Sequence, residues 1–107
     1  YASEHASYEF LNSPAGRTVN RICHKYGFII RYEANKTDIT GIDYEPWHLR
    51  YVGAPHAEII YRSKITLEEY LECLTVGDYY RFGNHILTRR ADGVYAGLSA
   101  SPHETHV

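Results

Sequence analysis

The residues with the clearest chemical potential lie near the middle of the chain, in the stretch Glu45-Pro46-Trp47-His48. A carboxylate three residues before a histidine is suited to zinc-dependent hydrolysis. In that chemistry an imidazole holds the metal, and a carboxylate takes a proton from the metal-bound water. The alternative is a strand with a buried tryptophan and two solvated polar residues. One Glu-x-x-His is too short a pattern to decide between the two.

The segment 44–52 is predicted to be a strand, and this bears directly on the chemistry. A side-chain period of two sends Trp47 to one face and His48 with Arg50 to the other. Glu45 lies an odd number of residues from His48, so a straight strand would point these two side chains in opposite directions. Proline fixes φ and donates no ladder hydrogen bond, so Pro46 can bend the chain. We expect that bend to let the carboxylate and the imidazole meet.

The elements around this strand are marked by clear start and stop signals. Ser13-Pro14 opens a helix that Gly27 closes, and a β-rich strand follows at 28–32. The polar segment 33–43 is predicted to be a loop or irregular hairpin. A helix is expected from Pro55 to about Ser63, and Thr66-x-x-Glu69 is a capping box for another that ends near Leu74.

Beyond Leu74 the pattern changes to short strands and tight turns. Strands are expected at 79–82, 85–89 and 94–96, separated by Gly83-Asn84 and Ala91-Asp92-Gly93. The tail from Leu98 is rich in Ser, Pro and His, and we expect it to be disordered at its end. We therefore expect the chain to have two parts. Residues 1–75 would be a partial catalytic domain, and residues 76–107 would be a small β appendage with a disordered tail.

Composition excludes several classes of protein. Eleven basic and thirteen acidic side chains give a net charge of −2, and the basic residues are scattered, which disfavours nucleic-acid binding. No apolar run reaches membrane-spanning length, and no signal peptide is visible. Cys23 and Cys73 do not form a Cys-x-x-Cys motif, which argues against a structural zinc site or a redox motif. Each falls at an apolar position of a predicted helix, so two buried free thiols are expected, although a disulfide is permitted outside the cytoplasm. His24 and His56 are predicted to be packing or surface residues.

The order of several separate motifs resembles one enzyme family. Glu45 to Gly53 follows His24 to Tyr32 and Lys36 to Gly41, and it precedes His56 to Tyr61 and Leu67 to Leu71. This succession resembles the C-terminal half of VanY-type D-alanyl-D-alanine carboxypeptidases, zinc enzymes that trim peptidoglycan stem peptides. The resemblance is continuous from Arg17 to Leu74. It also reaches Ser3-Glu4-His5, which looks like the start of the family motif Ser-x-His-x-x-Gly-x-Ala-x-Asp.

The first metal motif departs from the family pattern. The family's two ligands there are the histidine, matched by His5, and an aspartate, whose position holds Asn12; Tyr8 replaces the glycine. A neutral amide is a poor zinc ligand. Glu9, four residues after His5, could substitute if the segment were helical. The family's upstream region, with an arginine for the substrate carboxylate, has no counterpart before Ser3. We therefore expect a domain truncated at the N-terminus.

The resemblance implies a set of roles for residues of this chain. Glu45 would be the general base, and His5 and His48 would bind one zinc ion. Ser3, Trp47 and Arg50 would contact the substrate, a peptidoglycan stem peptide. The implied setting is extracellular or in the bacterial cell envelope, as a monomer.

The predicted fold is α+β, a small antiparallel sheet with helices packed on one face, resembling the zinc DD-peptidase fold. The predicted function is zinc-dependent removal of the terminal D-alanine by an incomplete catalytic domain. The alternative is a catalytically inactive remnant or a peptidoglycan-binding domain. Because the aspartate ligand is missing, the sequence does not decide whether the protein is an enzyme.

Overall fold

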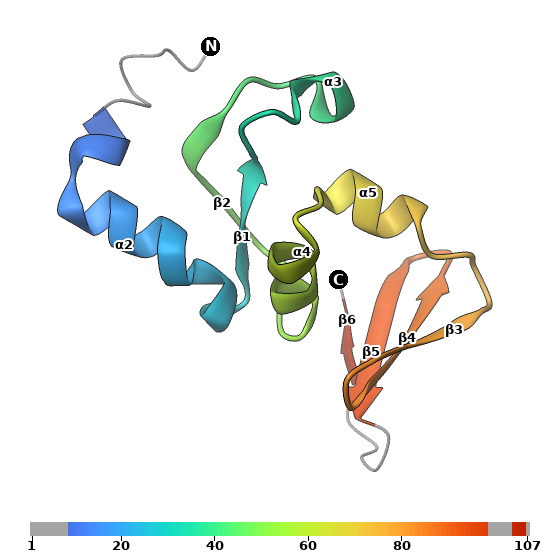
Figure 1. Ribbon diagram of the computed structural model, residues 1–107. Coiled ribbons are helices and arrows are strands. Elements are labelled where there is room, and N and C mark those ends of the chain that lie inside the picture. The colour runs from blue at the N-terminus through green and yellow to red at the C-terminus, as the bar shows by residue number, and fades with distance from the viewer. Residues whose placement is uncertain (1–8, 99–103, 107) are drawn as a thin grey trace.

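The computed structural model describes residues 9–98 and 104–106 of the 107-residue chain. Two antiparallel sheets are joined by helices in an α+β arrangement (Figure 1). The first sheet has two strands, β1 (Phe28–Tyr32) and β2 (Glu45–Tyr51). The second has the order β3-β4-β5-β6, from β3 (Tyr79–Phe82), β4 (His85–Arg90), β5 (Gly93–Leu98) and β6 (Glu104–His106). The fold class predicted from the sequence is confirmed.

The helix predicted after Ser13 begins and ends at the residues that the sequence predicts. The Ser13 side chain accepts a hydrogen bond from the Gly16 amide and caps α2 (Pro14–Ile22), which continues as the 3₁₀ helix η1 (Cys23–Tyr26). Gly27 ends η1 in the left-handed conformation, at φ 89°. A Cβ there would lie 2.7 Å from the Tyr51 ring, so glycine suits both the conformation and the space. Its carbonyl accepts hydrogen bonds from the Val52 and Gly53 amides, which ties the end of η1 to the end of β2.

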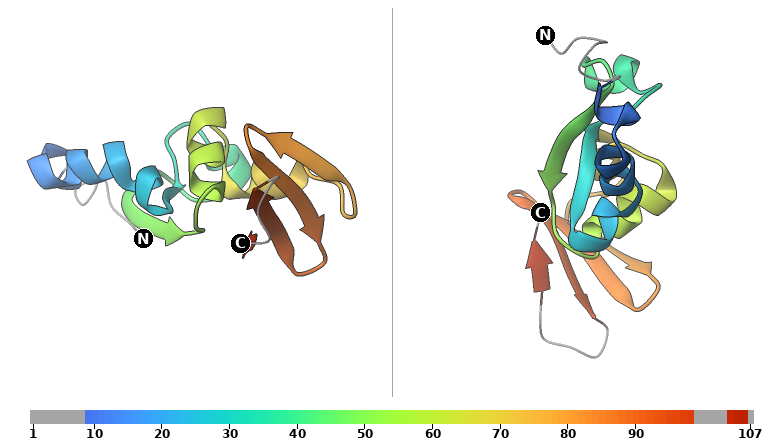
Figure 2. Two further views of the ribbon diagram at one scale, coloured as in Figure 1. Left: turned by 90° about the horizontal axis from the view of Figure 1, so that it is seen from below. Right: turned by 90° about the vertical axis from the view of Figure 1, so that its left-hand side faces the viewer.

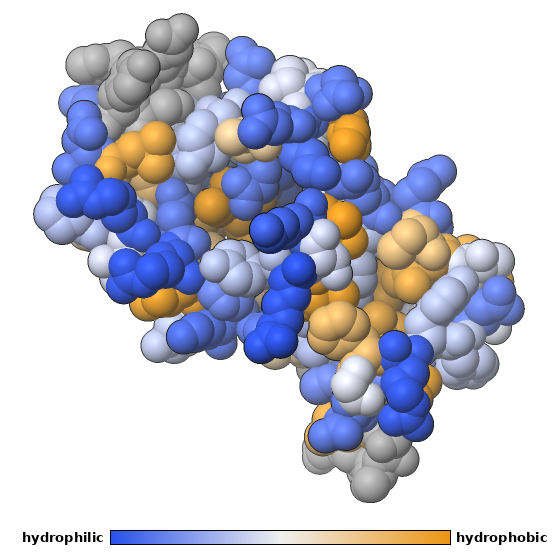
Figure 3. All heavy atoms as spheres, in the orientation of Figure 1, coloured by the Kyte–Doolittle hydropathy of each residue, from blue (hydrophilic) through white to orange (hydrophobic). Residues whose placement is uncertain are grey.

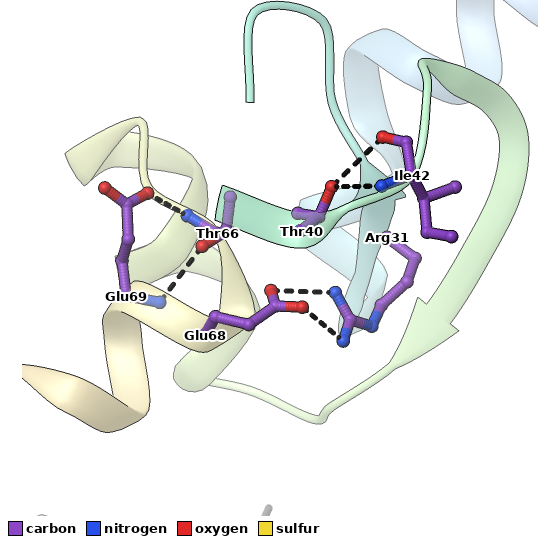
Figure 4. A network of polar contacts seen from close by, with 6 residues as sticks. All are labelled: Arg31, Thr40, Ile42, Thr66, Glu68 and Glu69. Atoms are coloured by element: carbon purple, nitrogen blue, oxygen red, sulfur yellow. Dashed lines mark hydrogen bonds and ion pairs between the residues drawn. The ribbon is translucent and has the colours of Figure 1, made fainter. Parts of the chain in front are cut away.

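The helices after β2 connect the two sheets. α4 (His56–Ser63) packs against β1 and η1, and α5 (Leu67–Glu72) follows after a short link. Thr66 and Glu69 form the predicted capping box, and Arg31 of β1 makes a bidentate ion pair with Glu68 at 2.8 and 2.9 Å (Figure 4). These contacts fix the start of α5 against the first sheet.

One hydrophobic core spans both sheets. Its buried residues come from β1, α4, α5 and the second sheet: Ile29, Val52, Ala57, Ile59, Ile60, Leu67, Tyr70, Leu74, Leu87, Val94 and Ala96. The molecule is elongated, with extents of 45 × 27 × 19 Å, and α2 and the second sheet lie toward opposite ends (Figure 2). The face in Figure 3 is mostly hydrophilic, with apolar side chains visible in smaller areas between charged ones. None of the described helices is long and apolar enough to cross a membrane.

Three details differ from the sequence-based expectations. The segment 33–43 contains a short helix, α3 (Thr37–Thr40), where a loop or hairpin was expected. Both cysteines are free, but Cys73, at the C-cap of α5, is exposed because it points away from the face that carries the buried Tyr70 and Leu74. Residues 104–106 form β6 beside β5, whereas the end of the tail was expected to be disordered; β5 offers them an open edge with which to pair.

Candidate active site

An irregular pairing of β1 with β2 brings the candidate catalytic residues together. The register is regular from Phe28 to Ile30 and then shifts, so that Tyr32 lies opposite Glu45. Pro46 is fully buried, and its carbonyl accepts a hydrogen bond from the Asn20 side chain of α2 at 2.8 Å. A bulged ladder breaks the strict alternation of side chains between the two faces. Glu45 can therefore turn toward the side on which His48 lies.

The Glu45 carboxylate and the His48 imidazole are in direct contact. Glu45 Oε1 lies 2.9 Å from His48 Nδ1. The Glu45 side chain is 15% exposed and that of His48 is 46% exposed, so the ring faces solvent while the carboxylate is sheltered. The sequence-based expectation that these two side chains meet is confirmed. Their roles as general base and metal ligand remain predictions.

Tyr32 is a third member of the site that the sequence analysis missed. Its ring stands edge-on to the His48 ring, with centroids 5.2 Å apart. The Arg31 guanidinium lies 4.7 Å from the centre of the Tyr32 ring while it binds Glu68. Only the register shift brings Tyr32 to this place, so no local sequence signal could have revealed it.

The other predicted site residues fall into two groups. Trp47 is half-buried and Arg50 is exposed, and both lie on β2 within a few residues of the Glu45–His48 pair. Arg50 lies opposite Ile29, in the regular part of the ladder, whereas His48 lies in the irregular part and contacts Glu45 and Tyr32. His5 and Ser3 lie outside the described residues.

The described part of the chain does not contain a full zinc site. No group of three or more His, Cys, Asp or Glu side chains in it could hold a metal ion. Catalytic zinc sites have three protein ligands and an open position. His48 fits such a role, with Glu45 beside it, but two side chains are too few. At least one ligand of a three-ligand site must therefore come from outside the described residues.

The two other histidines near the core have packing roles, as predicted. His24 is buried and stacks on Tyr61, with ring centroids 3.5 Å apart. His56 is completely buried and shares a hydrogen bond of 2.8 Å with the Tyr70 hydroxyl, which links α4 to α5. Burial raises the pKa of Tyr70, so its hydroxyl stays protonated.

A cavity of about 540 Å³ lies away from the Glu45–His48 pair. Its lining comes from η1, β1, the segment 33–36, α4 and the residues just after α4. Glu33 lines it, and burial raises the pKa of this carboxyl above its usual value. We nevertheless place the candidate active site at the exposed His48 and its neighbours on β2, because the acid and the imidazole in contact are there and not in this cavity.

Comparison with known proteins identifies the segment that carries this pair. The family model described as VanY, D-alanyl-D-alanine carboxypeptidase, matches residues 2–54. Residues 2–54 belong to the VanY family. This VanY segment contains both β1 and β2, hence Glu45, His48 and Arg50. The family predicted from the sequence is confirmed, whereas β3 to β6 lie outside the matched residues.

Individual relatives agree with the VanY assignment. A D-alanyl-D-alanine carboxypeptidase of Enterococcus faecium is 50% identical over 62 residues, which cover 58% of this chain and 20% of that protein. The LdcB LD-carboxypeptidase structure has 51% identity and a TM-score of 0.58, covering 61% of this chain and 30% of that one. The structure of VanYB in complex with D-alanine-D-alanine has 44% identity and a TM-score of 0.55, covering 57% and 34%.

The chain thus spans between a fifth and about a third of the length of these relatives. The VanY segment contains α2, η1 and the two-stranded sheet of β1 and β2. The activity, substrates and partners of the relatives come to this chain only as proposals.

Proposed function

We propose that this chain is part of a zinc-dependent D-alanyl-D-alanine carboxypeptidase of the VanY family. In this proposal it acts on peptidoglycan stem peptides in the cell envelope or outside the cell. The observation that carries the proposal is the 2.9 Å contact between Glu45 and His48 within a VanY segment. An acid and an imidazole in contact on one strand are the pair that such hydrolysis uses.

In the proposed reaction Glu45 is the general base and then the general acid. Its carboxylate takes a proton from the attacking water and delivers it to the amine of the leaving D-alanine. Glu45 Oε1 contacts His48 Nδ1, so in this proposal Oε2 is the oxygen that accepts the proton. His48 would hold the zinc ion together with His5 and a third ligand that is not identified, for which Glu9 is a candidate. When bound, zinc polarises the scissile carbonyl and lowers the pKa of water.

The remaining proposed contacts concern the substrate. Ser3 and Trp47 would help to orient the stem peptide, and the exposed Arg50 offers a cation beside it. We propose that the protein acts as a monomer without a nucleic-acid partner. Both D,D- and L,D-linked stems remain candidates, because relatives with D-alanyl-D-alanine and with LD-carboxypeptidase names both match.

The second candidate function is peptidoglycan binding without catalysis. It is favoured by Asn12 at the position of the family's aspartate ligand, and by the lack of a three-ligand cluster in the described residues. A silent domain would keep its peptide-contacting surface but would hold no stoichiometric zinc.

The two candidates are separated by D-alanine release from synthetic tetrapeptide and pentapeptide stems, together with zinc content. For the enzyme we expect about one zinc per chain, and a rate at least roughly 100-fold lower for Glu45→Gln, since a positioned general base contributes about that much or more. Glu45→Gln should retain zinc, and His48→Ala should lose it.

Glu72→Gln serves as the matched control, because Glu72 is an exposed carboxylate on α5. It should leave release unchanged. Release that survives Glu45→Gln would remove the proposed base. Stem-peptide binding without zinc or D-alanine release would establish the binding domain instead.

A further inference from the structure

The cavity of about 540 Å³ lies between η1, β1 and α4, which contact one another (Figure 1). The segment 33–36 forms one of its sides. Much of its wall is apolar, with side chains from β1, from α4 and from the residue that follows α4's C-cap: Phe28, Ile30, Ile60 and Ile65. A cavity of this volume with a mainly apolar wall is typical of a binding site for a small organic molecule. We call it the β1–α4 cavity.

Glu33 is the acidic residue in the wall of the β1–α4 cavity. Its side chain is half-buried, and in the part of the chain that the structure describes no hydrogen bond or ion pair reaches its carboxylate. A carboxylate that is partly removed from water and has no partner is destabilised when it is ionised. A positively charged ligand would supply the missing partner.

His24 adds a second polar atom without a partner to the same wall. Its side chain is 7% exposed and its ring stacks on Tyr61, while Nδ1 is buried and has no hydrogen-bond partner among the described residues. Buried polar atoms in proteins are ordinarily hydrogen bonded. A neutral ring with its proton on Nε2 presents Nδ1 as an acceptor. His24 and Glu33 therefore both call for a donor.

The basic residues of the wall are compensated in other ways. Lys36 Nζ pairs with Glu69 at 3.0 Å, and Arg62 Nε pairs with Glu58 at 2.6 Å, so acids outside the cavity match both charges. Lys64 is exposed at the C-cap of α4, where water solvates its ammonium group. An exposed charge gains little from a partner, whereas a half-buried one gains more. Glu33 is therefore the charged group that a ligand would stabilise most.

We propose that the β1–α4 cavity binds a small organic cation, an ammonium group carried on an apolar body. The ammonium has three N–H donors, which suit the Glu33 carboxylate and His24 Nδ1, and the apolar body packs on the wall. A group that opposes folding but serves a ligand is a recurrent feature of binding sites. Neither Glu45 nor His48 lines this cavity, so the inference does not depend on the proposed carboxypeptidase activity.

The test uses three probes with the same aromatic ring and different end groups: 2-phenylethylamine, 2-phenylethanol and 3-phenylpropionate. NMR titrations of the isotope-labelled whole chain, in mildly alkaline buffer of low salt, give their affinities and locate the bound probe. We expect the amine to bind roughly tenfold tighter than the alcohol, because a hydrogen bond to a charged group contributes about that much. The amide signals of residues 33–36 should shift with the amine.

Glu33→Gln should remove the preference for the amine and leave the affinity for the alcohol unchanged. Ala34→Trp places a large side chain at an exposed position of the wall and should weaken all three probes. Glu72→Gln, at an exposed carboxylate of α5, is the matched control and should change none of them. The amide spectrum of each variant verifies that it is folded.

Four results would overturn the inference. Undetectable binding of the amine, or equal affinity for the amine and the alcohol, would show that the cavity does not select a cation. Tighter binding of 3-phenylpropionate would show that the basic residues govern the site. An amine preference that survives Glu33→Gln would remove Glu33 from it, and amine binding unaffected by Ala34→Trp would place the probe elsewhere.

Discussion

At the scale of single residues, whether two side chains on one strand meet depends on irregularities of the backbone as well as on their spacing in the sequence. Glu45 and His48 would point apart on a regular strand, yet they meet at 2.9 Å because the register shifts opposite Glu45. Glu33 shows a second local effect. Burial raises the pKa of Tyr44, and repulsion by the half-buried Glu33 carboxylate raises it further. Burial also raises the pKa of Glu33 itself. A carboxylate in that position opposes folding when it is ionised.

Glu33→Gln should therefore stabilise the protein at neutral pH. The folded-state pKa of Glu33 lies above its usual value of 4.5, so the folded state binds this proton more tightly than the unfolded state. The stability that the group contributes is present below that usual value and is lost as the pH rises through the raised pKa. We expect a higher melting temperature than the unaltered protein at pH 7, and no difference well below pH 4.5.

Glu72→Gln is the control for the loss of one negative charge, because Glu72 is exposed. If Glu72→Gln raised the melting temperature by the same amount, the stabilisation would come from the change in net charge and not from the burial of Glu33. A pH-independent effect of Glu33→Gln would contradict the role of burial.

At the scale of elements, α5 depends on anchors at its first turn. The Glu69 amide donates to Thr66 Oγ1 at 3.0 Å, and the Thr66 amide donates to Glu69 Oε1 at 2.8 Å. Glu69 also pairs with Lys36. Glu68 pairs with Arg31 of β1 (Figure 4). These partners hold the pKa of both glutamates below the usual value. A six-residue helix has little intrinsic stability, so such contacts decide whether it forms.

Thr66→Ala should lower the free energy of unfolding by about 1 kcal/mol, the usual cost of a lost N-cap. The reason is that the Glu69 amide loses its acceptor at a buried position. Urea unfolding followed by circular dichroism measures the change. Thr75→Ala is the matched control, since Thr75 is exposed and its hydrogen bonds run through the backbone. An unchanged midpoint for Thr66→Ala would show that the capping box is not needed.

At the scale of the whole molecule, the second sheet shares its core with the VanY segment. Leu87, Val94 and Ala96 of this sheet belong to the same buried cluster as Ile29 of β1 and Tyr70 of α5. Arg89 adds polar contacts with α5. We propose that the parts on either side of residue 75 unfold together.

Leu87→Ala tests this coupling, because it creates a cavity in the second sheet while Trp47, the single tryptophan, reports on the first. Loss of a buried leucine costs about 2 to 5 kcal/mol. If the core is shared, the unfolding midpoint measured by Trp47 fluorescence should fall by the same amount as that measured by circular dichroism. Leu98→Ala, at an exposed position of β5, should leave both midpoints in place. If Leu87→Ala left the unfolding midpoint measured by Trp47 fluorescence unchanged, the two sheets would unfold as independent units.

Most of the elements could be predicted because their signals are local. Ser13-Pro14, Gly27 and the Thr66 capping box determine backbone hydrogen bonds within a few residues, and they mark the helix ends correctly. The strand 28–32 also has its predicted bounds. The helix α3 was missed because it has four residues and no side-chain cap. Cys73 was misplaced because its exposure depends on the direction in which its side chain points at the end of α5.

The sequence by itself determined the VanY assignment, the order of elements and the choice of Glu45 and His48 as the candidate catalytic pair, because residue type and spacing along the chain carry that information. Only the tertiary structure decided that Tyr32 stands beside His48, that Arg31 binds Glu68, and that Glu33 lines one cavity with residues of α4. These contacts join segments that are far apart in the chain. Their geometry depends on strand register and core packing, which no local pattern specifies.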